Sequence, residues 1–92
     1  MFIEMDGLMK PIDGKQNDPR INYTLGKRIK TARKSLGLSQ THIAAALGVS
    51  FQQVGKYESG QNTMSVPTFL TICQALRLRP SSLLDEYLGR ER

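Results

Sequence analysis

Between residues 22 and 88 the hydrophobic positions follow the 3.6-residue period of an α-helix, interrupted by short polar segments. In the first of these helical segments the apolar side chains recur at i, i+4, i+7 and i+11 and so share one side of a helix: Leu25, Ile29, Ala32 and Leu36. Asn22 is suited to cap this helix, and Gly37 is suited to end it in a left-handed conformation. The pattern therefore predicts a helix over about residues 23–36.

Two short helices are predicted next, separated by a tight turn. Ser39 can cap a helix that ends at Gly48, and Ser50 can cap a helix that ends at Gly60. Gln53 stands three residues after Ser50, which is the spacing of a Ser-x-x-Gln capping box. The apolar positions of both helices are spaced to face inward: Ile43, Ala44, Leu47, Val54 and Tyr57.

Two further helices complete the pattern. Ser65 can cap a fourth helix, which tolerates Pro67 in its first turn, and Pro80 fits the first position of a fifth. The apolar face of the fourth helix comprises Phe69, Ile72, Cys73 and Leu76. The apolar residues of the fifth are Leu83, Leu84, Tyr87 and Leu88. Because no segment alternates with the period of a strand, the sequence predicts an all-α domain of five helices over residues 22–88.

The two ends of the chain lack this periodicity. In residues 1–21, Gly7, Pro11 and the Asn-Asp-Pro run at 17–19 interrupt any repeat, so we expect a flexible N-terminal arm. Residues 89–92 are expected to form a short C-terminal tail. The first residues also lack the basic start and apolar core of a secretory signal, and no apolar run approaches the ~18 residues of a membrane span.

The distribution of charge indicates which part of the chain would contact a nucleic acid. The 92 residues carry a formal net charge of +5, which alone is a weak indication of a nucleic-acid partner. The charge is uneven, because residues 1–19 carry −2, residues 20–64 carry +6 and residues 65–92 carry +1. The positive charge thus coincides with the first three predicted helices, and a solvated basic helix face remains the alternative interpretation.

Candidate catalytic and metal-binding chemistry is sparse. The single cysteine, Cys73, excludes an internal disulfide bond and leaves no Cys/His cluster for structural zinc. The sequence shows no carboxylate pair and no Gly-rich phosphate loop, and His42 alone is a weak indication of general-base catalysis. We therefore predict that the chain is not an enzyme and needs no cofactor or metal. Cys73 is expected to lie in the core and His42 on the surface.

Residues 40–60 carry the most informative pattern. Ala44 is small where the two short helices cross, and Gly48 supplies the positive φ that their turn requires. Two helices at this spacing form a helix-turn-helix, whose second helix can enter a DNA major groove about 12 Å wide. The outward positions of this second helix are Phe51, Gln52, Gln53, Gly55 and Lys56.

These residues resemble the phage-repressor-like helix-turn-helix family of Cro, C1 and XRE type. The resemblance covers about residues 23–86. It rests on Leu36-Gly-Leu-Ser-Gln40, Ile43-Ala44, Leu47-Gly-Val-Ser50, Val54 and Lys56-Tyr-Glu-Ser-Gly60. It implies a lambda-repressor-like DNA-binding domain of five helices, in which the second and third helices form the helix-turn-helix.

The resemblance also assigns roles to residues. Those expected to read bases from the recognition helix, about residues 50–59, are Ser50, Phe51, Gln52, Gln53 and Lys56. Gln52 is the first choice because it lies in the first turn. Those expected at DNA phosphates are Arg33, Gln40, Ser59, Gln61 and Asn62. Those expected to add electrostatic field rather than specific contacts are Lys27, Arg28, Lys30 and Lys34.

Several positions leave alternatives open or depart from the family pattern. Phe51 either packs on a thymine methyl group or covers the core, and Gln53 is divided between capping its own helix and touching DNA. Glu58 is expected to face back toward the domain. His42 stands where the family often has an acidic residue, and Arg77 stands where a glycine commonly follows the fourth helix. A left-handed arginine costs roughly 1 kcal/mol.

Members of this family usually bind palindromic DNA as two-fold dimers, with half-sites about one helical turn (~34 Å) apart. The predicted dimer interface is Leu83, Leu84, Tyr87 and Leu88, of which a part must also close the monomer core. The resemblance implies a cytoplasmic, nucleoid-associated regulator of bacterial or phage type that binds double-stranded DNA as a homodimer, most simply a repressor. The alternative is an antitoxin or adaptor whose main role is to bind a partner protein.

Overall fold

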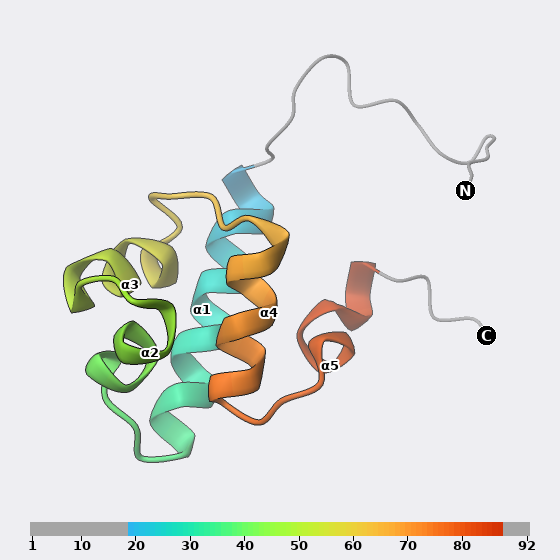
Figure 1. Cartoon of the computed structure of the whole chain (residues 1–92). Coiled ribbons are helices and arrows are strands. Elements are labelled where there is room, and N and C mark those ends of the chain that lie inside the picture. Colours follow the sequence, from blue (N-terminus) through green and yellow to red (C-terminus); the bar gives the residue numbers. More distant parts are fainter. Residues whose placement is uncertain (1–18, 88–92) are drawn as a thin grey trace, which may run out of the picture.

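Five α-helices follow one another along residues 19–87, the part of the chain that the computed structural model describes (Figure 1). Their bounds are α1 Pro19–Ser35, α2 Gln40–Leu47, α3 Phe51–Ser59, α4 Val66–Ala75 and α5 Pro80–Leu84, and a short 3-10 helix over Asp85–Tyr87 follows α5. The described residues contain no strand, so the predicted all-α fold of five helices is confirmed.

The helices pack around one hydrophobic core, with α1 and α4 in the middle of the molecule (Figure 1). The short helices α2 and α3 lie on one side of this pair, and α5 lies on the other. α1 packs against α3 and α5, while α2 packs against α3 and α4. The buried apolar side chains are Ile29, Ile43, Ala44, Val54, Phe69, Ile72, Cys73, Leu76 and Leu83.

The predicted helix ends are formed by local polar groups and left-handed residues. The side chains of Ser39, Ser50 and Ser65 each accept a hydrogen bond from the backbone N–H three residues later. These three caps begin α2, α3 and α4, as predicted. Gly48 and Gly60 end α2 and α3 with φ of 73° and 83°, values that glycine adopts without steric cost.

The first helix begins earlier than the sequence pattern predicts. It starts at Pro19, because proline is well suited to the first position of a helix, and not after a cap at Asn22. The Asn22 side chain instead donates a hydrogen bond to the Thr63 hydroxyl over 3.1 Å. Residues 19–21 therefore belong to α1. The rest of the expected arm, the tail at 89–92 and Leu88 lie outside the described residues.

The buried face of α1 also differs from the predicted stripe. Gly26, Ile29 and Arg33 are its buried residues, whereas Leu36 is 51% exposed because the helix ends at Ser35. Cys73 lies in the core, as predicted, and burial raises the pKa of its thiol. Across the described ranges, no helix has the length and apolar character that crossing a membrane requires.

Candidate nucleic-acid interface

The turn between α2 and α3 is fixed by backbone hydrogen bonds and by two buried side chains. The backbone N–H groups of Gly48 and Val49 both donate to the Ala44 carbonyl, over 2.8 and 3.1 Å. Ile43 from α2 and Val54 from α3 are fully buried behind the turn. This is the predicted helix-turn-helix geometry, and it holds the outer side of α3 away from the core.

The outer side of α3 is a polar stripe. Gln52, Lys56 and Ser59 are exposed and stand at i, i+4 and i+7, so they share one face of the helix. Phe51 is 52% exposed, and Ser50 is exposed at the cap. Four of the five residues predicted to read bases are thus open to solvent, with an aromatic ring, an amide and an ammonium group among them.

The fifth, Gln53, is half-buried and makes a different contact from either of the two expected. Its backbone N–H donates to the Ser50 hydroxyl, but its side-chain Nε2 donates to Oδ1 of Asn62 over 2.8 Å. The capping box is therefore only half formed. The contact ties α3 to the loop that follows it, which also carries the exposed Gln61.

Gly55 does not face outward as predicted. A Cβ atom at this position would lie 3.6 Å from Nε2 of Gln40, in ordinary van der Waals contact. Gly55 therefore faces the start of α2, where Gln40 is the first residue. Unpaired backbone N–H groups at such a helix start favour a phosphate group, which is consistent with the predicted role of Gln40.

A buried ion pair joins α1 to α3. Nε of Arg33 lies 2.7 Å from Oε2 of Glu58, and Nη2 lies 3.1 Å from Oε1. Arg33 also donates to the carbonyl of Leu38 over 2.8 Å, and Gln40 donates to Oε1 of Glu58 over 3.0 Å. The two charged residues are 7% and 5% exposed. Glu58 thus faces the domain, as expected.

This network gives Arg33 a structural role that the sequence did not predict. A guanidinium group that is buried and holds a carboxylate through two parallel hydrogen bonds is committed to the protein interior. Arg33 therefore positions α3 and Gln40, and its contact with a DNA phosphate stays a prediction. The other residues predicted at phosphates are half-buried at the start of α2 or exposed at the end of α3 and beyond: Gln40, Ser59, Gln61 and Asn62.

Gly26 allows α1 to pack closely against α3, and the sequence pattern did not single it out. A Cβ atom here would lie 2.4 Å from the backbone oxygen of Tyr57 and 2.5 Å from that of Glu58. The backbones of α1 and α3 can approach this closely only because position 26 has no side chain. A glycine inside an otherwise helical pattern was the available signal.

Two departures from the family pattern have visible consequences. The ring Nε2 of His42 is exposed but lies 3.2 Å from the carbonyl oxygen of Ala75, the last residue of α4, and so links α2 to α4. Arg77 is left-handed, with φ of 56°, and is the one residue other than glycine with positive φ in the described part of the chain. The strain expected at Arg77 is therefore present.

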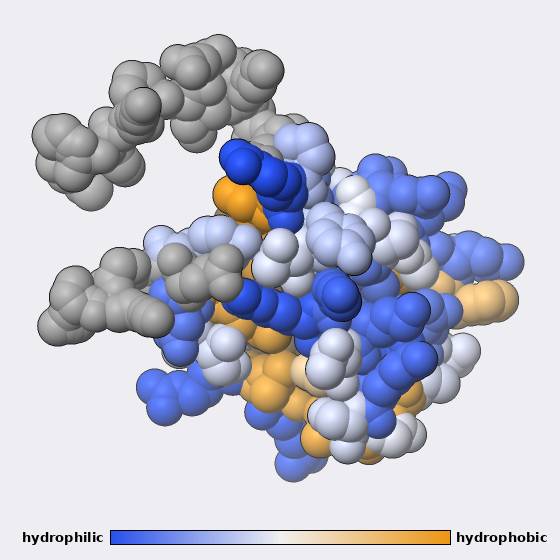
Figure 2. Space-filling model, turned by 180° about the vertical axis from the view of Figure 1, so that it is seen from behind, coloured by the Kyte–Doolittle hydropathy of each residue, from blue (hydrophilic) through white to orange (hydrophobic). Residues whose placement is uncertain are grey.

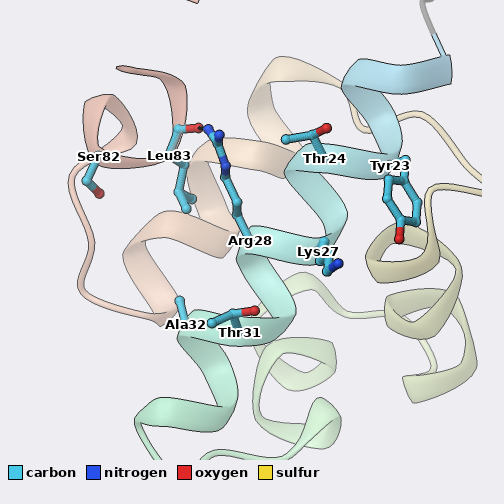
Figure 3. Close-up of a pocket in the computed structure, with 8 residues that line it drawn as sticks. All are labelled: Tyr23, Thr24, Lys27, Arg28, Thr31, Ala32, Ser82 and Leu83. Carbon is cyan, nitrogen blue, oxygen red and sulfur yellow. Dashed lines mark hydrogen bonds between the residues drawn. The ribbon is translucent and has the colours of Figure 1, made fainter. Parts of the chain in front are cut away.

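The residues predicted at a dimer interface are divided by the structure. Leu83 is 5% exposed and closes the monomer core, as was expected of a part of this set. Leu84 is half-buried and Tyr87 is 38% exposed. Beside them lies a pocket of about 580 Å³ that is lined by residues of α1 and α5 (Figure 3). Arg28 extends across this pocket and donates a hydrogen bond to the Leu83 carbonyl over 2.9 Å.

The described residues form no candidate metal site. Within residues 19–87, no three His, Cys, Asp or Glu side chains lie close enough together to hold a metal ion. The side of the molecule opposite to Figure 1 is mostly hydrophilic, with apolar side chains in smaller patches between the polar ones (Figure 2).

The chain is similar in sequence and in structure to known helix-turn-helix proteins. A helix-turn-helix family model matches residues 29–83. The HTH-type transcriptional regulator y4wC of Sinorhizobium fredii is 38% identical over 72 residues, which are 78% of this chain and 50% of that protein. The restriction-modification controller protein C.AhdI from Aeromonas hydrophila superposes with a TM-score of 0.62 at 33% identity, over 66% of this chain and 92% of that chain.

A weaker similarity concerns a protein of another class. The antitoxin PezA of Streptococcus pneumoniae is 31% identical over 62 residues, which are 67% of this chain and 39% of that protein. The chain spans about half the length of several curated relatives that it matches.

Proposed function

The chain belongs to the helix-turn-helix family, and we propose that it is a transcriptional regulator that binds a specific sequence of double-stranded DNA through α3. The observation that carries this proposal is the exposed stripe of Gln52, Lys56 and Ser59 on a helix whose inner side is fixed. A glutamine amide can bond to N6 and N7 of adenine, and a lysine can reach O6 and N7 of guanine. Gln52 is the proposed primary base contact.

The fixed inner side of α3 supports the proposal energetically. Val54 and Glu58 hold the helix against α2 and α1 through apolar packing and through the ion pair with Arg33. A recognition helix that is already held in place loses little conformational freedom when it binds DNA. The proposed phosphate contacts at either end of the motif are Gln40, Ser59, Gln61 and Asn62.

We further propose that the protein binds as a homodimer and acts as a repressor. One recognition helix reads only a few base pairs, so two copies on a palindrome give the specificity that a promoter requires. Leu84 and Tyr87 are the described members of the predicted set that retain surface for this contact. A bound dimer would occlude the promoter without a cofactor or a catalytic step, in the cytoplasm where the DNA lies.

The similarity to the antitoxin PezA favours one alternative function. In that case the main role would be to bind a partner protein, with DNA binding secondary. Co-purification of a stoichiometric partner encoded beside the gene would support it. The two roles are separable, because a partner-binding adaptor would keep its partner when Gln52 is changed.

Selection of bound duplexes from a random-sequence pool tests the proposed function. We expect enrichment of one palindromic sequence whose half-sites lie about one helical turn apart. Retention of the whole pool without enrichment would contradict sequence-specific recognition. An enriched single half-site would contradict the dimer but not the base-reading role of α3.

A further inference from the structure

A lysine-lined groove of about 420 Å³ lies between α1 and the C-terminal end of α3. Lys27, Lys30 and Lys34 from α1 and Ser59 from α3 are among the residues that line it. The lysines stand at i, i+3 and i+7, so they point to one side of the helix. Figure 3 shows Lys27 and Tyr23 on the side of α1 that faces α3.

The acidic residue that lines this lysine groove does not neutralise the charge of the lysines. The acidic residue that lines it, Glu58, already accepts hydrogen bonds from Arg33 and Gln40 on its oxygens. Lys27 has its ammonium group 5.7 Å from the centre of the Tyr23 ring. Lys30 and Lys34 are exposed, and no carboxylate among the described side chains lies within ion-pair distance of them.

The lysine groove continues the surface that we assign to DNA. Gln52, Lys56 and Ser59 form the exposed stripe of α3, and Ser59 at its end also lines the groove. A duplex seated on the stripe therefore brings its backbone toward α1. The three lysines span about 10 Å along the helix axis, which is similar to the length of three base pairs at 3.4 Å each.

We propose that Lys27, Lys30 and Lys34 form a second phosphate-binding surface, which contacts the duplex backbone beside the bases read by α3. The inference rests on the proposed function and extends it. It assigns direct contacts to lysines that were expected only to add field. Each ammonium group that neutralises a phosphate releases condensed counterions and so increases the salt dependence of binding.

The test compares two double variants that remove the same charge from different places. Lys30→Gln/Lys34→Gln changes the groove, while Arg77→Gln/Arg79→Gln changes exposed residues in the connection to α5. Because α5 lies across α1 and α4 from α3, the arginine pair is the matched control for net charge (Figure 1). Fluorescence anisotropy with a 40-base-pair random-sequence duplex measures affinity over a salt series.

For the lysine pair we expect a roughly tenfold or greater loss of affinity at low salt and a salt slope lower by about 2. The arginine pair should change the slope by clearly less than 1. Equal effects of the two pairs would overturn the inference, because they would indicate that only the net charge of the protein affects DNA binding. So would an unchanged slope for the lysine pair.

A second readout separates this inference from the proposed function. The lysine pair should keep the wild-type ratio of affinities for the selected and random duplexes, since phosphate contacts carry no sequence information. Loss of that ratio would overturn the assignment of these lysines to phosphates. If the wild-type protein itself binds neither duplex, the proposed function fails directly and the inference fails with it.

Discussion

At the scale of single residues, a buried ion pair holds two helices together, as apolar contacts do elsewhere in the core. Arg33 and Glu58 connect α1 to α3 with bonds of 2.7 and 3.1 Å, and Gln40 extends the network to α2. The inward role of Glu58 was predictable from the family resemblance. That of Arg33 was not, because an arginine on the same helix as three lysines looks like a member of a solvated basic face.

Removing one partner of this pair should be costly. For Arg33→Met we expect a loss of about 3–5 kcal/mol in the free energy of unfolding, because Glu58 would keep a buried and unpaired charge. The double variant Arg33→Met/Glu58→Leu should recover much of this loss. Urea denaturation followed by circular dichroism measures both, and a loss below about 1 kcal/mol in the single variant would contradict the structural role.

The left-handed Arg77 allows a stabilising substitution. Glycine adopts φ of 56° without the steric cost that a side chain brings, so Arg77→Gly should raise the free energy of unfolding by about 1 kcal/mol. Arg79→Gly is the control, because φ is −77° there and glycine should destabilise slightly. Thermal melting of both variants shows the sign, and destabilisation by Arg77→Gly would contradict the strain.

At the scale of elements, the helix boundaries divide into those set locally and those set by tertiary contacts. The starts of α2, α3 and α4 were predictable because a serine hydroxyl bonds a backbone N–H three residues away. The buried face of α1 was not predictable. Its register depends on Gly26 meeting the backbone of α3, which is 31 and 32 positions later in the chain.

Because of the close contact at Gly26, replacing this glycine with alanine should change stability in the opposite direction from the one that helix propensity predicts. On helix propensity alone, Gly26→Ala should stabilise α1 by about 1 kcal/mol. We expect instead a loss of about 1–3 kcal/mol, because the new methyl group overlaps the carbonyl groups of Tyr57 and Glu58. The displaced α3 should also bind DNA more weakly.

Gly55→Ala provides the matched control for this prediction. It is also a glycine within a helix, but its added Cβ would make only an ordinary contact with Gln40 at 3.6 Å. We expect it to be neutral or stabilising in the same denaturation assay. If both variants behaved alike, the close approach of α1 and α3 would not be the determining factor.

At the scale of the whole molecule, the sequence predicted the side that we propose to face DNA, but it was less informative about the surface at the opposite end. The charge of +6 on residues 20–64 and the helix-turn-helix spacing agree with the exposed stripe of α3. The predicted dimer set is divided between the core and the surface, as expected, but periodicity cannot separate an apolar residue that closes the monomer core, such as Leu83, from one that remains for a partner.

A dimer that uses the remaining C-terminal surface should be sensitive to charge at Tyr87. We expect the wild-type protein to sediment as a dimer at micromolar concentration and Tyr87→Glu to sediment as a monomer, because an interface core excludes an unpaired carboxylate. Leu70→Glu is the control, since Leu70 is an exposed leucine on α4 outside the predicted set. A dimer that tolerates Tyr87→Glu would locate the interface elsewhere.

The central claim is that α3 reads a base sequence, and the most direct test is the effect of Gln52→Ala on two duplexes. One duplex carries the selected sequence, and the other carries the same bases in scrambled order. We predict a loss of about 1–3 kcal/mol in binding free energy on the selected duplex and almost none on the scrambled one. An equal loss on both, or a wild-type protein that binds the two duplexes equally well, would contradict the claim.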